Sequence, residues 1–180
     1  MAVQYYVASS LDGFIAAPHD DLGWLLQFGM TEFSDHFDAF LSNVGAIIMG
    51  SSTYEFILRE GDDAWSYGMT PTWVLTSREL PTIEHADIRF TATAIEEIVG
   101  DARDAAGHQN VWVVGGGDVA AQIADARLLD EMHVTLMPIV LGSGTRLLPV
   151  TTPTPPLQLL RSTQFDLGAV ELVYTLHGAG

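Results

Sequence analysis

The stretch that most constrains the fold is NVWVVGGGDV, residues 110–119, in which an apolar run stops at three glycines. The run 111–114 is short, uniformly apolar and rich in valine, which is typical of a strand buried on both faces. Residues 118–126 then place apolar side chains on one face at helical spacing, which predicts a helix. The glycines at 115–117 are therefore expected to form a strand-to-helix turn.

Such a turn suits a phosphate group, because free backbone N–H groups and the positive end of a helix dipole point to one spot. Close packing of a helix against a strand explains clustered glycines equally well. The pattern Gly115-x-Gly117-x-x-Ala120 matches a Rossmann fingerprint, but that motif requires an acidic residue about 20 positions later. Residues 134–140 read VTLMPIV and contain no acid. A standard Rossmann fold is therefore disfavoured.

The composition removes several classes of chemistry. The chain has no cysteine, and its seven basic residues are all arginine. Thiol nucleophiles, P-loop lysines and Schiff-base lysines are therefore excluded. Any anionic ligand must be held by backbone N–H groups, hydroxyls and arginines. The His19–Asp21 loop lacks a diagnostic metal-ligand spacing, and we expect no metal site.

Length and charge limit the organisation and the partners. A chain of 180 residues is long enough for one domain, which we expect over residues 1–180. The formal net charge of −16 argues against nucleic-acid and anionic-membrane partners, because the electrostatic term would be repulsive. No signal-peptide pattern and no apolar run of membrane-spanning length occur in the sequence. We therefore expect a cytoplasmic protein whose partner is a small molecule.

A second buried strand, residues 45–50, also ends in glycine just before an expected helix. Ser52 and Glu55 have the spacing of a capping box, which predicts Ser52 as the N-cap. Ser51 and Thr53 then remain free to bind an anion at the same helix end. This strand end therefore predicts a second turn that is compatible with an anion.

A third strand, residues 72–77, is followed directly by Arg78. An arginine beside a hydroxyl at a strand end suits a phosphate monoester, although an isolated surface arginine gives the same pattern. A further capping box, Thr93 to Glu96, predicts another helix that stops at Gly107.

The order of the expected elements predicts the fold class. Strands alternate with helices as far as residue 126, and strands dominate after it. This order predicts an α/β fold whose mostly parallel sheet has helices on both faces and antiparallel strands at one edge. Ligands gather at the carboxyl ends of such strands, so Gly50, Ser77 and Gly115 are expected on one rim. The other expected elements are strands at 3–9, 88–90, 131–140, 157–165 and 169–176 and a helix at 31–44.

The loop from Ser10 to Ala16 contains the dipeptide Asp12-Gly13, which indicates a turn. Phe14 and Ile15 resume an apolar run after it. These side chains either close over a flat ligand or fill the core, and the residues alone favour the core.

Five segments together resemble the dihydrofolate reductase-like superfamily, and in particular the branch of the reductase domain of bacterial riboflavin biosynthesis. They follow the family's order along nearly the whole chain, which is more specific than any one motif. The segments are ASSLDGFIA (8–16), IMGSSTYE (48–55), VLTSR (74–78), VVGGGDV (113–119) and PIVLGSGTRLL (138–148).

The resemblance implies a three-layer dihydrofolate reductase-like fold and an NADPH-dependent reductase. The implied reaction is hydride transfer to a small pyrimidine- or pterin-like substrate, similar to that of 5-amino-6-(5-phosphoribosylamino)uracil reductase. The implied cofactor positions are Ala8, Ile15 and Ala16 at the nicotinamide, Gly50, Ser51, Ser52 and Thr53 at the phosphates, Val114, Gly115, Gly116, Gly117, Asp118 and Val119 around the pyrophosphate, Thr76, Ser77 and Arg78 at the ribose and 2′-phosphate, and Gln122 near the adenine.

The resemblance also suggests residues for catalysis and substrate binding. Asp12 is the best candidate for a proton donor, although an Asp before Gly is equally typical of a plain turn. Trp24, Phe28 and Trp65 are candidates for the substrate pocket, and core packing is the alternative for such large apolar groups. Ser51 stands where the family commonly has a basic residue.

The position of Ser51 leaves two questions open. Arg78 becomes the main cation for a 2′-phosphate, so NADH remains an alternative to NADPH. A nucleotide-binding or regulatory domain that has lost the chemistry is the alternative function.

A homodimer formed through the strand-rich edge is a further expectation.

Overall fold

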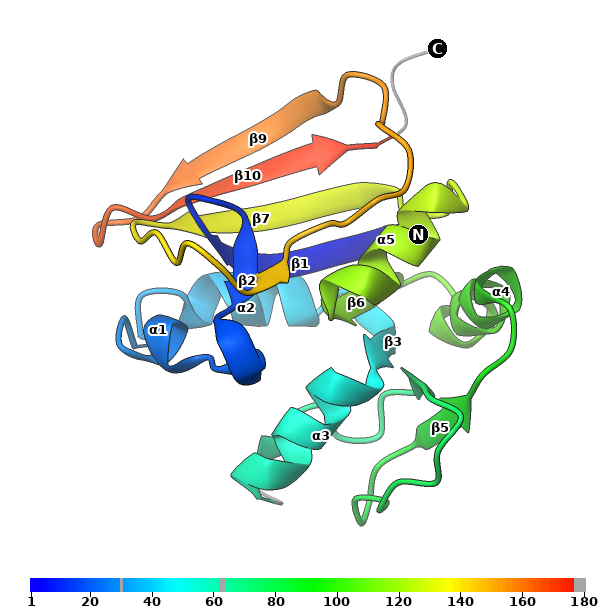
Figure 1. Ribbon diagram of the computed structural model, residues 1–180. Coiled ribbons are helices and arrows are strands. Elements are labelled where there is room, and N and C mark those ends of the chain that lie inside the picture. Colours follow the sequence, from blue (N-terminus) through cyan, green and yellow to red (C-terminus); the bar gives the residue numbers. More distant parts are fainter. Residues whose placement is uncertain (30, 62–63, 177–180) are drawn as a thin grey trace.

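In the computed structural model the chain forms one large twisted sheet with helices on both of its faces (Figure 1). The structure describes residues 1–29, 31–61 and 64–176. The strands are β1 (Val3–Ser10), β2 (Phe14–Ala16), β3 (Val44–Gly50), β4 (Thr72–Leu75), β5 (Ile88–Thr91), β6 (Asn110–Gly115), β7 (Glu131–Met137), β8 (Thr145–Arg146), β9 (Gln158–Gln164) and β10 (Val170–Thr175). The helices are α1 (Gly23–Leu26), α2 (Ser34–Leu41), α3 (Ser51–Glu60), α4 (Ile95–Ala106) and α5 (Gly117–Asp125), with a 3₁₀ turn, η1, at Pro18–Asp20.

The eight-stranded sheet has the order β5-β4-β3-β6-β1-β7-β10-β9. Its first six strands are parallel, and β10 pairs antiparallel with both β7 and β9. Strands β2 and β8 form a separate small antiparallel pair. The expected α/β architecture, mostly parallel with antiparallel strands at one edge, is confirmed.

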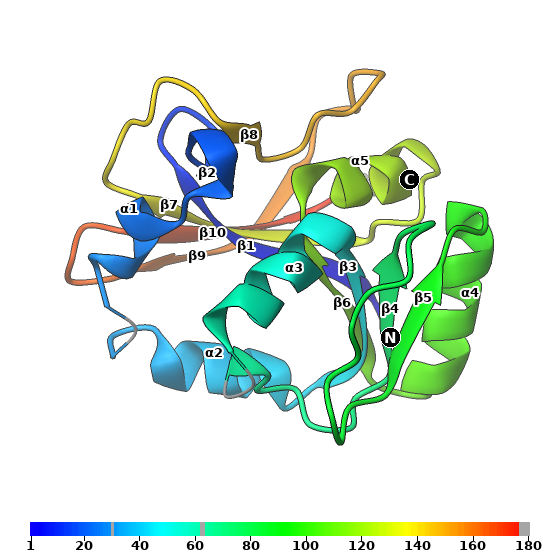
Figure 2. The ribbon, with the colours of Figure 1, turned by 60° about the horizontal axis from the view of Figure 1, so that its bottom comes forward.

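The inner strand β3 is buried on both faces because its side chains alternate between two apolar layers. Ala46 and Ile48 pack in the layer formed by α4 and α5. Ile47 and Met49 pack in the opposite layer, against α2 and α3. Figure 2 shows these helix pairs on the two sides of the sheet. A continuous apolar strand is what two-sided burial requires.

Both predicted capping boxes are wrong. The N-cap of α3 is Gly50, not Ser52, and no side chain caps the helix. The N-cap of α4 is Ala94, and the hydroxyl of Thr93 instead contacts that of Thr91 at 3.1 Å. Helix α3 starts two residues before and α4 one residue after the position that its motif requires, so neither hydroxyl caps the first turn.

Two further differences concern element boundaries and pairing. The helix expected over 31–44 is shorter, since α2 covers only Ser34–Leu41. The segment 141–146, which lies outside the expected strands, contains β8, and β8 pairs with β2 near the other end of the chain. Within the described ranges, no helix is both long and apolar enough to cross a membrane.

Two glycines provide a test of the packing between β3 and α4. A Cβ added at Gly45 would lie 2.7 Å from the carbonyl oxygen of Ala106 and 2.9 Å from the Cβ of Gln109. A Cβ at Gly100, inside α4, would meet nothing within 4 Å. We expect Gly45→Ala to lower the free energy of unfolding by about 1–3 kcal/mol, because the overpacked backbone must shift.

The matched variant Gly100→Ala should instead raise the free energy of unfolding by about 0.5–1 kcal/mol, because alanine favours the helix. Urea unfolding measures both variants. Equal changes in the free energy of unfolding, or changes opposite in sign to those expected, would contradict this packing of β3 against α4.

Candidate functional site

A cavity of about 890 Å³ lies at the carboxyl ends of the parallel strands β3, β4, β5 and β6. Gly50, Leu75, Thr91 and Gly115, the last residues of these four strands, all line it. Its opposite side is formed by residues of β1, β2, α1 and α2. The expected rim of strand ends is therefore present, and it borders one continuous cavity.

The glycine turn after β6 forms part of the cavity wall. A Cβ at Gly116 would meet nothing within 4 Å, whereas one at Gly117 would collide with the carbonyl oxygen of Arg146. Gly115 has φ +154°, and its Cβ would lie 3.3 Å from the hydroxyl of Thr53. The turn therefore brings bare backbone to the cavity at Gly116 and close-packed backbone at Gly117.

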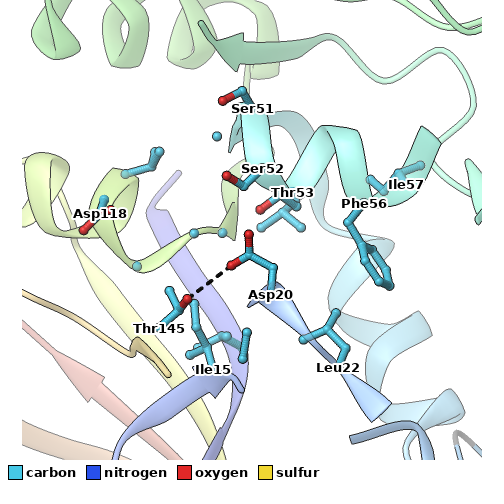
Figure 3. A pocket seen from close by; sticks show the side chains of 18 of the residues that line it. Ile15, Asp20, Leu22, Ser51, Ser52, Thr53, Phe56, Ile57, Asp118 and Thr145 are labelled. Carbon is cyan, nitrogen blue, oxygen red and sulfur yellow. Dashed lines mark hydrogen bonds between the residues drawn. The ribbon is translucent and has the colours of Figure 1, made fainter. Parts of the chain in front are cut away.

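Two helices begin at the cavity, α3 at Ser51 and α5 at Gly117. The first N–H groups of a helix have no acceptor within the helix, and they carry its positive dipole end. Ser51, Ser52 and Thr53 lie in the first turn of α3, and their hydroxyls are labelled in Figure 3. No side chain caps α3. These hydroxyls are therefore not used as caps, and their residues line the cavity as additional polar groups.

The other half of the cavity is lined by apolar and aromatic side chains. Burial raises the pKa of Tyr67 to about 12, and burial is also the largest cause of the raised pKa of Tyr6. Both phenols are therefore protonated at neutral pH and can donate a hydrogen bond. We call this half the apolar chamber, and its residues are Tyr6, Leu22, Leu25, Phe33, Phe37, Phe56, Ile57 and Tyr67.

The charged groups of the described cavity wall are the carboxylates Asp20 and Asp118. The hydroxyl of Thr145 donates to Asp20 at 3.3 Å, as Figure 3 shows. Asp118 lies in the first turn of α5, where the helix dipole favours a negative charge. The charged side chains of the described wall are therefore negative, and its other polar side chains are mainly neutral hydroxyls.

All the cofactor positions implied by the family resemblance line this one cavity, except Arg78. Arg78 follows Ser77, which does line it, and its guanidinium donates to Glu55 of α3 at 2.9 and 3.1 Å. The side chain of Arg78 is 57% exposed. The tertiary structure thus gathers segments that lie up to 114 residues apart, from Ala8 to Gln122, around one space. Their role in binding stays a prediction.

Asp12 lies outside the cavity wall and is held by three hydrogen bonds. It accepts from the hydroxyl of Ser10 at 2.7 Å and from the backbone N–H groups of Leu141 and Gly142 at 3.0 and 2.6 Å. These bonds, that of Ser10 first, lower the pKa of Asp12 to about 2. The carboxylate therefore ties the turn after β1 to the loop after β7. Its expected catalytic role stays a prediction.

The three expected substrate residues lie beside the cavity wall but not in it. Trp24 is buried against Met137 and Phe165, and Phe28 packs on the same cluster. The indole N–H of Trp65 donates to the carbonyl of Gly68 at 2.9 Å. Trp24 and Trp65 thus take part in packing and local hydrogen bonding, as the alternative interpretation expects.

The sequence interpretation missed most of the apolar chamber. Leu25 follows Trp24, and Tyr67 lies two residues after Trp65, so other side chains of the same two segments line the cavity. Thr91 and Thr93 were also missed. They follow the expected strand 88–90, and the carboxyl-end rule for parallel strands would have found them.

The hydrogen bonds of Asp12 predict a pH dependence of stability. Because the pKa of Asp12 is lower in the folded protein than its ordinary value of 3.8, its stabilising effect is complete above about pH 4. The effect is lost as the pH falls towards about 2. We expect Asp12→Asn to reduce stability at pH 7 and to flatten this acid decline.

Urea midpoints measured from pH 7 down to the acid range test this prediction, with the unaltered chain as control. An unchanged midpoint at pH 7 together with an unchanged acid slope would contradict the structural role of Asp12.

Comparison with known proteins identifies the family through one family model. The model of the RibD C-terminal domain matches residues 58–170, which is more than half of the chain. The uncharacterized protein YwjB of Bacillus subtilis (strain 168) is 29% identical over 172 residues, 94% of this chain and 94% of that protein.

Two solved structures show the fold. A protein of Shewanella sp. PV-4 named for riboflavin biosynthesis has a TM-score of 0.81 at 24% identity, over 97% of this chain and 98% of that one. The dihydrofolate reductase of Enterococcus faecalis, solved with NADP(H), has a TM-score of 0.63 at 17% identity, over 97% of this chain and 95% of that one. The chain therefore has the dihydrofolate reductase-like fold and belongs to the RibD C-terminal domain family.

Proposed function

We propose that this chain is an NADPH-dependent reductase acting on a small molecule. One observation carries the proposal: a single cavity joins a rim of helix N-termini and glycine backbone to an apolar chamber. Its volume of about 890 Å³ lies in the range typical of cofactor and ligand sites. Membership of a family with a reductase-like fold supports the same conclusion.

The rim fits the pyrophosphate of a dinucleotide. Gly116 has open space where a Cβ would be, so a phosphate can approach its backbone closely. The N-termini of α5 and α3 supply N–H groups and positive dipole ends, and Ser52 and Thr53 add hydroxyl donors. A chain with no lysine can hold a pyrophosphate in this way without a cation in the wall.

The nicotinamide would lie where the rim meets the apolar chamber. Ala8, Ile15 and Ala16 line the cavity and offer small or branched apolar surfaces. When bound, NADPH supplies a hydride, and the protein supplies orientation. The residues of the chamber would then place the substrate beside the nicotinamide and exclude water.

Arg78 is the group proposed to hold the 2′-phosphate. Its ion pair with Glu55 is on the surface, with side-chain exposures of 57% and 32%, and such pairs contribute only about 0–1 kcal/mol. The guanidinium can therefore turn from Glu55 to a phosphate at little cost. Without that contact, NADH would bind as well as NADPH.

The second candidate function is a nucleotide-binding domain without turnover. It is favoured by the position of Asp12, whose three hydrogen bonds hold it outside the cavity wall. Both candidates require nucleotide binding. They differ in whether NADPH is consumed when an acceptor is added.

The role of Arg78 is tested by calorimetric titration with NADPH and with NADH. We expect Arg78→Ala to weaken NADPH binding about 10-fold, because a charge-assisted hydrogen bond is lost. Binding of NADH, which lacks the 2′-phosphate, should change less than about 2-fold.

The matched control is Arg89→Ala. Arg89 lies on the neighbouring strand β5 and also pairs with a surface carboxylate, Asp87, but it does not line the cavity. It should change neither affinity. An equal loss for both nucleotides in Arg78→Ala would remove the 2′-phosphate contact from the proposal.

The glycine rim is tested by Gly116→Val. Its φ of −77° suits any residue, and its side chain would enter the open space of the cavity. We expect NADPH affinity to fall at least about 10-fold, since the valine occupies the pyrophosphate position. Calorimetry gives the affinity, and thermal unfolding shows whether the variant is folded. A folded variant with unchanged NADPH affinity would place the pyrophosphate elsewhere.

A further inference from the structure

The part of the cavity wall that the structure describes has no positively charged side chain. No arginine is left out of this observation, because all seven arginines of the chain lie in the described ranges. It matters because the chain has no lysine. A phosphorylated substrate would therefore find no cation from Lys or Arg in the chamber.

None of the seven arginines lines the described cavity wall, although Arg59 lies over the ring of Phe56, a chamber residue. Two of them, Arg59 and Arg146, lie with the guanidinium carbon 5.9 Å from the ring centroids of Phe56 and Phe14. Arg127 follows the C-terminal end of α5 and is exposed. The remaining four form ion pairs, Arg78 with Glu55, Arg89 with Asp87, Arg103 with Asp130 and Arg161 with Glu171.

The charges that the cavity does contain are negative. In Figure 3 the carboxylate of Asp20 projects into the cavity, between Thr145 and Thr53 in that view. Asp118 adds a second carboxylate at the start of α5. Asp118 belongs to the rim, whereas the carboxylate of Asp20, in a chain with a net charge of −16, repels an anionic substrate. The backbone N–H groups of the rim can donate hydrogen bonds to an anion, but the proposed function assigns them to the cofactor.

The chamber is shaped by rings and branched side chains. The rings of Tyr6 and Phe37 are 5.8 Å apart, and Tyr67 stands edge-on to Trp112 at 5.4 Å. Phe56 and Leu22 project towards the same space in Figure 3. Such walls bind flat rings by contact area and stacking. The protonated phenols of Tyr6 and Tyr67 add neutral donors for a carbonyl or a ring nitrogen.

We propose that the substrate is a flat, uncharged aromatic or heteroaromatic molecule that carries no phosphate. This inference rests on the proposed function, because the rim is free of substrate phosphate only if the cofactor occupies it. It separates this chain from a reductase of phosphoribosyl-linked pyrimidines, whose substrate brings a dianion into the site.

The test uses a matched pair of unreactive probes, 1-naphthol and 1-naphthyl phosphate. Each is titrated by calorimetry into the full chain saturated with NADP⁺. We expect 1-naphthol to bind at least about 10-fold more tightly than its phosphate ester. Equal or tighter binding of the ester, or no binding of 1-naphthol, would overturn the proposal.

The same experiment separates the two proposals. The NADP⁺ titration comes first, and the absence of NADP⁺ binding would count against the reductase. In the chain alone the unoccupied rim can accept the phosphate of the ester, so the substrate class is judged only from the titration of the probe pair into the NADP⁺-saturated chain. A preference for the ester in that titration would overturn the substrate class by itself.

Two arginine variants show whether the chamber itself causes the discrimination. Leu22→Arg places a cation in the chamber and should raise the affinity for 1-naphthyl phosphate at least about 10-fold. Leu26→Arg makes the same charge change in the same segment, but Leu26 is 58% exposed and outside the cavity wall, so the affinity should not change. Phe56→Arg repeats the test from α3 if Leu22→Arg fails to fold. Equal gains in the chamber and control variants would assign the effect to net charge and overturn the proposal.

Discussion

The structure depends on the burial of β3 between two apolar layers. Ala46 and Ile48 on one face and Ile47 and Met49 on the other are all nearly inaccessible to water. Parallel neighbours on both sides, β4 and β6, require connections that cross back over the sheet. Those connections are the helices that cover the two faces, and every strand of the parallel set therefore ends at the same edge.

The cavity is a consequence of that edge. The chain leaves β3 and β6 through glycine and enters α3 and α5 without a side-chain cap. A glycine N-cap costs a helix only a few tenths of a kcal/mol relative to a capping side chain, and it leaves N–H groups and the hydroxyls of Ser51 and Thr53 free. The first turn of each helix is therefore less stable than that of a capped helix, and its N–H groups are open to a ligand.

The distribution of charge complements this arrangement. The chain has few cations, and ion pairs or exposed positions account for most of them. The cavity therefore relies on backbone dipoles and hydroxyls to attract negative charge, and these act only at short range. At the chamber the balance reverses, because Asp20 and the apolar walls oppose a charged group. One continuous space can in this way hold a charged cofactor beside an uncharged molecule.

The sequence by itself determined the order of strands and helices, the parallel arrangement and the strand ends that form the rim. These features follow from local patterns, namely apolar runs bounded by glycine and helical spacing after them, and the motifs that resemble the family lie on the same strand ends. Only the tertiary structure decided which neighbour faces the cavity, Leu25 rather than Trp24 and Tyr67 rather than Trp65. It also decided the pairing of β2 with β8 and the hydrogen bonds of Asp12 to Leu141 and Gly142. The physical reason is that a side chain's direction and a loop's partner depend on packing against segments more than 100 residues away, which no local pattern encodes.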